Sequence, residues 1–184
     1  MKAVILKYGL LAGIVVNGLM FGPIAVFGER PDWFRYGEIF GYSAMVLTMT
    51  ATYFAIRHAR SRQDGPFGFS RGLAIGVGVT AVASFLFGVA TYAFYRIMGD
   101  GFPQRLWDHY VAEIRGSGAD AATVARQLAE LESMRPLFFN YAFQAAVMFA
   151  TLFLIGLAVS LVSAAILRRR AWPSAVAASA LIGR

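Results

Sequence analysis

The distribution of charge constrains this 184-residue sequence most, because four long stretches contain no Asp, Glu, Lys or Arg. These stretches cover residues 8–28, 39–56, 72–95 and 136–167. A helix needs about 20 mainly apolar residues, within a range of roughly 17–25, to cross the hydrocarbon core of a bilayer. Membrane-spanning strands would alternate apolar and polar residues, and these stretches do not. The sequence therefore predicts an all-α integral membrane protein, a bundle of four transmembrane helices.

We place the spans at about residues 5–28, 37–57, 71–95 and 136–167 of a single membrane domain. Composition agrees, because 58% of the residues are hydrophobic and only 15% are charged, whereas soluble domains contain about 25% charged residues. The first stretch has some features of a cleaved signal peptide. Its apolar run is longer than usual for one, and no Ala-x-Ala-like site follows before Glu29. We therefore expect a retained helix.

Basic residues are distributed unequally between the two ends of the predicted bundle. One end carries the N-terminus, the loop after the second span and the chain beyond the fourth span, including a tail at 171–184. It holds ten of the 17 basic residues and one of the ten acidic residues. Because loops rich in Lys and Arg stay inside, we expect both termini in the cytoplasm, with no nucleic-acid partner. The arginines expected to meet anionic headgroups there are Arg57, Arg60, Arg62, Arg71, Arg168, Arg169 and Arg170.

Residues 96–135 are too polar to enter lipid and read as two short amphipathic helices in a periplasmic insert. The first opens near Pro103 and stops at Gly116, and the second begins about Asp120, where Ser117 and Asp120 resemble a capping box. Their apolar faces would cover the bundle or the headgroups, or would dock a periplasmic partner. The residues of this candidate docking face are Leu106, Trp107, Tyr110, Val111, Ile114, Val124, Leu128 and Leu131.

Groups that carry catalysis or bind metals are scarce in this sequence. It contains no cysteine, and its two histidines, His58 and His109, are predicted at opposite ends of the bundle. Asp108 and Glu113 flank His109, and Glu113 could reach it, but two ligands on a solvated helix make a weak metal site. No phosphate loop, dinucleotide fingerprint or nucleophile elbow occurs. We therefore predict no catalytic residue, no metal and no cofactor.

The strongest polar groups within the predicted spans are the amides Asn17, Asn140 and Gln144. Buried amides usually join helices in lipid, although they could also line a transport path. Small residues recur four apart, as in the last span at Gly156, Ser160 and Ala164. Such stripes let helices approach closely, either within one chain or between copies of it.

Several short motifs, in their order and spacing, make the sequence resemble the bacterial membrane family called domain of unknown function 4199. The resemblance covers residues 2–170 and implies four helices in a bacterial inner membrane, with no implied activity. Some relatives carry an acidic residue and prolines midway in the last span, where this chain has ATLFL at residues 150–154. The matching motifs are KYG at 7–9, GYSAM at 41–45, Arg60, FSRG at 69–72, GSGA at 116–119, IGL at 155–157 and SAAILRRR at 163–170.

Together these patterns favour a non-enzymatic scaffold or subunit that acts through its helices and its periplasmic hairpin. Its expected partners are membrane lipid, a second copy of the chain, or another membrane or periplasmic protein. The alternatives are a small oligomeric transporter or channel built on the three amides, and an enzyme at the lipid interface using Asp108, His109 and Glu113.

Overall fold

The computed structural model describes residues 1–27, 31–63 and 65–168, without the side chains of residues 27 and 31–35. All regular structure in these residues is helical, as predicted. Four segments are long and apolar enough to cross a membrane: Lys2–Val26, Tyr36–Ser61, Phe69–Met98 and Tyr141–Leu167. The helices are α1 (Lys2–Phe27), α2 (Pro31–Met49), α3 (Ala51–Ser61), α4 (Phe69–Met98), α5 (Gly101–Arg115), α6 (Ala121–Ser133), α7 (Arg135–Phe138) and α8 (Tyr141–Leu167).

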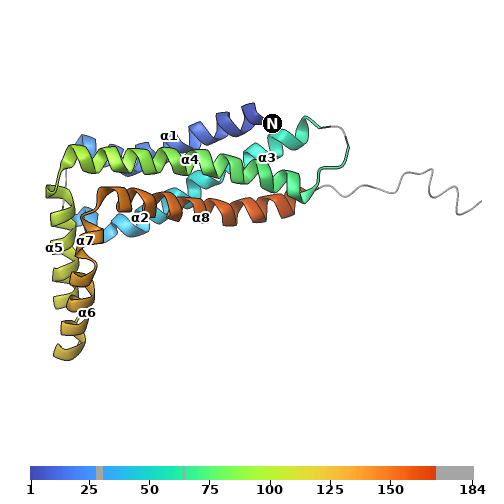
Figure 1. Cartoon of the computed structure of the whole chain (residues 1–184). Coiled ribbons are helices and arrows are strands. Elements are labelled where there is room, and N and C mark those ends of the chain that lie inside the picture. The colour runs from blue at the N-terminus through green and yellow to red at the C-terminus, as the bar shows by residue number, and fades with distance from the viewer. Residues whose placement is uncertain (28–30, 64, 169–184) are drawn as a thin grey trace, which may run out of the picture.

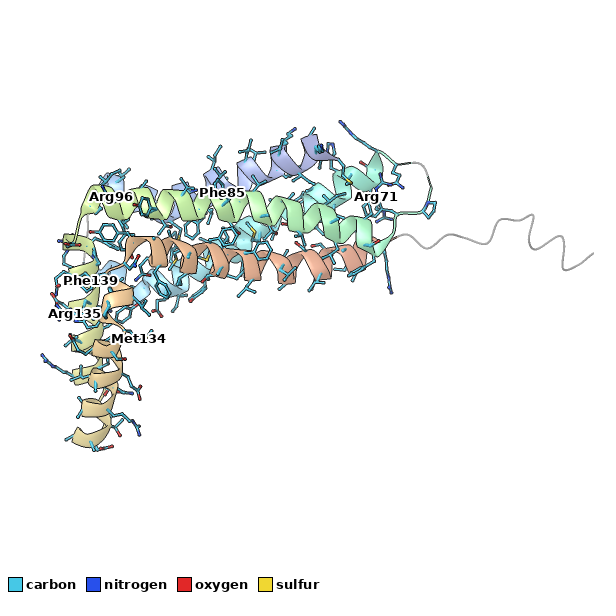
Figure 2. The ribbon with its side chains drawn as sticks, viewed as in Figure 1. Arg71, Phe85, Arg96, Met134, Arg135 and Phe139 are labelled. Carbon is cyan, nitrogen blue, oxygen red and sulfur yellow. The ribbon has the colours of Figure 1, made fainter. Side chains whose placement is uncertain are left out.

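The long helices lie side by side, while α5 and α6 form a hairpin that runs crosswise to them (Figure 1). We call the end of the bundle that carries this hairpin the hairpin end. Met1, the α3–α4 connection and the end of α8 lie together at the opposite end, which we call the basic end. Arg71 and Arg96 mark the two ends of α4 (Figure 2). Arg57, Arg60, Arg62, Arg71 and Arg168 belong to the basic end, whereas Arg169, Arg170 and the tail lie outside the described residues.

Small residues bring α4 and α8 close together towards the basic end. A methyl group added at Gly76 of α4 would lie 2.7 Å from the Ser160 side chain of α8, and one at Gly72 would lie 3.3 Å from Ala164 Cβ. Helix α1 approaches α4 in the same way, because a methyl group at Gly9 would lie 2.7 Å from Val82 Cβ. The small-residue stripe therefore packs within the chain, where close backbone approach maximises van der Waals contact.

The second span is interrupted at Thr50, between α2 and α3. The Thr50 hydroxyl donates to the Leu47 carbonyl over 2.6 Å, which places a side chain in the hydrogen-bond ladder of the helix. Beyond this point α3 packs against α1, α4 and α8, whereas among the described residues α2 packs against α1 and α8 and barely touches α4. Opposite α3, α4 presents Gly72 and Gly76, but opposite α2 it presents bulky aromatic residues. The second span therefore packs against α4 at the basic end and is separated from α4 at the hairpin end.

One predicted boundary, the start of the fourth span, and one predicted cap, that of the second hairpin helix, were wrong, whereas the predicted start of the hairpin helix at about Asp120 is confirmed. The fourth span begins at Tyr141 and not at residue 136, because Asn140 Oδ1 accepts a hydrogen bond from the Phe143 amide over 3.1 Å and starts a new helix. Helix α6 is capped by Asp120, which accepts from the Thr123 amide over 2.9 Å. Ser117 instead donates to the Ile114 carbonyl behind it, so the expected capping box does not form.

Candidate functional site

A cavity of about 340 Å³ occupies the space between α2 and α4 at the hairpin end. Ligand cavities usually measure about 300–1000 Å³, so this one has room for a single chain or ring system. Its walls come from α1, α2, α4, α5 and α8. Most of the lining is apolar: Met20, Phe21, Ile24, Phe40, Met45, Phe87, Phe94, Phe102, Leu106, Val147 and Met148.

Packed aromatic rings form the wall of this cavity on the side of α1 and α4. Phe21 stacks on Phe94 with ring centroids 4.8 Å apart, and Phe94 meets the edge of Phe102 at 5.0 Å. Three methionines, Met20, Met45 and Met148, supply further wall surface. Their unbranched side chains adapt to irregular apolar ligands at low cost. The cavity thus combines a fixed aromatic wall with adaptable surface.

The cavity reaches the protein surface beside α2. Phe40 and Tyr42, which both line it, are 47% and 56% exposed, and Val147 across the opening on α8 is 36% exposed. All three lie within segments long and apolar enough to span a membrane. Hydrocarbon, and not only water, therefore has access to this opening in a bilayer.

The principal polar feature of the lining joins Glu38 of α2 to Tyr110 of α5. The Tyr110 hydroxyl donates to Glu38 Oε1 over 3.3 Å. Burial, and then the negative charge of Glu38, raises the pKa of Tyr110 to about 12, so this hydroxyl stays protonated at neutral pH. No described Lys or Arg forms an ion pair with Glu38. A carboxylate with one hydroxyl partner thus stands at the edge of an apolar cavity.

The three amides singled out in the sequence form local hydrogen bonds and are not among the described residues that line the cavity. Asn17 Nδ2 donates to the Gly13 carbonyl over 2.7 Å, and Gln144 Nε2 donates to the Phe138 carbonyl over 2.9 Å. Asn140 caps α8. Asn140 and Gln144 therefore organise the entry of the chain into the last span.

The candidate docking face of the hairpin is largely covered within the protein. None of its eight residues is fully exposed, and Trp107 is buried. The centroid of the Trp107 ring lies 5.3 Å from the centroid of the Phe138 ring. The Arg135 guanidinium lies 5.6 Å from the centroid of the Trp107 ring. Arg135 is labelled in Figure 2. A second hollow is shared by Ile114 of α5 and Leu131 of α6, so the apolar faces of the two helices turn towards each other. Leu106 and Tyr110 belong to the wall of the cavity between α2 and α4.

Reactive groups do not gather at this site. In the part of the chain that the structure describes, no three His, Asp or Glu side chains are placed to hold a metal ion. His58 lies near the basic end, where its Nδ1 is 3.4 Å from the Tyr8 hydroxyl, whereas His109 belongs to the hairpin. The apolar lining of the cavity is suited to binding an apolar molecule.

Sequence reasoning missed Glu38 as a site residue, because it counted this residue only as one acidic charge between the first two spans. Its position was the available signal. Glu38 lies one residue before the charge-free stretch 39–56, within the apolar segment Tyr36–Ser61. A carboxylate at the border of an apolar segment favours a polar partner, because the adjoining hydrocarbon does not solvate its charge.

A family model matches residues 7–169, most of the chain. The chain belongs to the DUF4199 family of proteins of unknown function. The resemblance predicted from the short motifs is therefore confirmed. Comparison with curated proteins and with solved structures gave no match.

Proposed function

We propose that this protein is a non-enzymatic protein of the bacterial inner membrane that binds one hydrocarbon chain of a membrane lipid. The observation that carries the proposal is the 340 Å³ cavity, whose lining is mostly apolar, with Phe and Met as its commonest apolar side chains, and which is open beside α2. Burying a hydrocarbon chain against such walls gains dispersion contacts that an empty cavity forfeits. In a bilayer, lipid surrounds the protein at the opening beside α2, so the proposed ligand is always present there.

The charge distribution supports a definite orientation for this site. We assign the basic end to the cytoplasm, because Lys and Arg concentrate there. Both termini are then cytoplasmic, and the cavity opens in the outer half of the bilayer. The hairpin is then periplasmic and, since it runs crosswise to the bundle, follows the membrane surface (Figure 1). Its amphipathic helices suit the headgroup region.

Binding fits the hydrogen bonds of the polar residues better than transport or catalysis does. The transporter hypothesis depends on Asn17, Asn140 and Gln144, whose hydrogen bonds to nearby backbone favour a structural role. The enzyme hypothesis depends on Asp108, His109 and Glu113, and Asp108 accepts a hydrogen bond from Gln104 on the same helix. A lipid-binding protein serves as a scaffold or subunit without chemistry of its own.

A pair of substitutions on α8 tests the proposal. Thr151 lines the cavity, whereas Leu154, less than one turn away, is 64% exposed. Thr151→Trp should fill the cavity, and Leu154→Trp should add the same bulk on the lipid-facing surface. Native mass spectrometry in mild detergent should find one retained phospholipid in the wild type and in Leu154→Trp, and none in Thr151→Trp.

Thr151→Phe serves as a milder substitution if the tryptophan variant does not fold, as judged by circular dichroism. Equal lipid retention by the cavity variant and by Leu154→Trp would reject the proposal. A wild-type protein that retains no lipid would reject it as well.

A further inference from the structure

We infer that the cavity selects its lipid by headgroup, and that Glu38 of α2 and Tyr110 of α5 bind the primary ammonium group of an aminophospholipid. This inference rests on the proposed function. It adds the chemical class of the ligand and the two side chains that recognise it.

The position of Glu38 along the span places it where the headgroup of a bound lipid would lie. Glu38 lines the cavity two residues inside the span Tyr36–Ser61, whose first residues lie at the hairpin end. The rest of the lining runs along α1, α4 and α8 towards Thr151 and Phe87. A chain seated in the cavity therefore places its headgroup near Glu38, where hydrocarbon gives way to headgroups. Among the described residues, space is available beside this carboxylate, because a methyl group added at the neighbouring Gly37 would meet none of their atoms within 4 Å.

Glu38 also has hydrogen-bond acceptor positions that none of the described residues fills. A carboxylate offers about four lone-pair sites, and the Tyr110 hydroxyl occupies one of them at 3.3 Å. The Glu38 side chain is exposed, and none of the described basic residues pairs with it. Among the described residues, the pair thus presents the negative charge of Glu38 and acceptor positions without a partner at the mouth of the cavity.

A primary ammonium group complements this site in both charge and hydrogen bonding. Its three N–H donors form charge-assisted bonds to carboxylate oxygens, which are stronger than bonds between neutral groups. A quaternary ammonium brings the same charge but no donor. An anionic headgroup without an amine is repelled by Glu38. Affinity should therefore fall in the order phosphatidylethanolamine, phosphatidylcholine, phosphatidylglycerol.

The apolar lining of the cavity favours a lipid over a water-soluble amine as the ligand. A water-soluble amine would gain the contact with Glu38 but would leave the Phe and Met surface of the cavity without an apolar partner. Ethanolamine and phosphoethanolamine, the headgroup without its chains, are therefore the competitors to include. They should not displace bound phosphatidylethanolamine at millimolar concentration.

The test uses the full-length protein reconstituted with equal amounts of the three phospholipids carrying identical acyl chains. After extraction into mild detergent, mass spectrometry of the retained lipid gives its composition and its amount per protein. In the wild type, phosphatidylethanolamine should exceed phosphatidylglycerol about tenfold, the ratio expected when the two differ by one charge-assisted hydrogen bond. Glu38→Gln should abolish that enrichment without lowering the total amount of bound lipid.

Glu130→Gln is the matched control, because it removes one negative charge from an exposed position on α6 and should keep the enrichment.

Identical lipid compositions in Glu38→Gln and the wild type would overturn the inference and leave the proposed function standing. If Glu38→Gln does not fold, the wild type decides alone, since retained lipid that is not enriched in phosphatidylethanolamine over both competitors overturns the headgroup assignment. Displacement by ethanolamine or phosphoethanolamine would overturn the lipid assignment. A wild type without any bound lipid would remove the proposed function itself.

Discussion

Gly156 of α8 packs against Thr80 of α4 so tightly that a methyl group added at Gly156 would overlap the Thr80 side chain. The same methyl group would approach Met49 Sδ to 2.8 Å, so three helices meet at this glycine. The Thr80 and Ser160 hydroxyl oxygens lie 3.4 Å apart in the same contact, and Ser160 also donates to the Gly156 carbonyl. This junction holds the second span against α4 next to Thr50, at the point from which α2 stands away from α4.

Gly156→Ala should therefore lower the stability of the bundle. Overpacking of a close contact costs about 1–3 kcal/mol, which exceeds the gain of about 1 kcal/mol from placing Ala in a helix. Gly18→Ala on α1 is the control, because a methyl group there meets no atom of the described residues within 4 Å. Thermal unfolding in detergent should show a lower midpoint for Gly156→Ala and an equal or higher one for Gly18→Ala. Equal shifts in both variants would contradict the close contact.

The bond between Tyr110 and Glu38 makes stability depend on alkaline pH. Burial and the Glu38 charge raise the pKa of Tyr110 from its ordinary value of 10.0 to about 12. A raised pKa stabilises the folded state fully below pH 10, and this contribution is lost as the pH rises through 12. Tyr110→Phe should therefore show a shallower loss of stability between pH 10 and 12 than the wild type. Tyr42→Phe controls for the removal of a tyrosine hydroxyl from the cavity lining, and superimposable profiles for all three proteins would count against the assignment.

The cap of α6 makes the hairpin depend on acidic pH. Hydrogen bonds from the Thr123 hydroxyl and amide hold the pKa of Asp120 below its ordinary value of 3.8. A lowered pKa contributes stability above the unfolded value, and this contribution is lost as the pH falls through the folded value. In NMR spectra the Thr123 amide resonance should titrate with a midpoint below 3.8. Asp120→Ala should abolish the titration and Glu130→Gln should preserve it; a midpoint at or above 3.8 would be evidence against the cap.

The four spans could be predicted from sequence because the cost of placing charge in hydrocarbon exceeds local preferences. The charge-free runs therefore located the helices whichever neighbours they pack against. The cavity could not be predicted, because it depends on which helices are adjacent and on the interruption at Thr50. A threonine within an apolar run does not by itself predict a helix interruption. The glycines of α4 allow close helix packing only where small side chains lie opposite them, and the sequence does not show which residues these are.

The start of the fourth span shows a second limit of sequence reasoning. Residues 136–167 form one charge-free run, yet α7 and a turn occupy its start, and α8 begins only after Asn140. An amide in an apolar run can lie deep in the bilayer or cap a helix at its border, and composition is the same in both cases. The hydrogen bond to the Phe143 amide decides between them, and it depends on the backbone conformation at Asn140.

The orientation of the bundle can be tested directly, because the native chain contains no cysteine. Ser61 near the basic end and Ser117 at the tip of the hairpin are both exposed, and each hydroxyl donates to the carbonyl three residues earlier, over 2.9 and 2.8 Å. Ser61→Cys and Ser117→Cys therefore perturb the local structure to a similar degree. In spheroplasts, a membrane-impermeant maleimide should label Ser117→Cys at once and Ser61→Cys only after permeabilisation.

The reverse labelling pattern would place the hairpin in the cytoplasm and the mouth of the cavity in the inner half of the bilayer. The lining of the cavity and the Glu38–Tyr110 pair would be the same in that orientation, but the lipid would come from the cytoplasmic leaflet. Labelling of both variants in intact spheroplasts would mean that the chain does not adopt one orientation. The labelling pattern thus decides which leaflet supplies the ligand, independently of whether Glu38 selects its headgroup.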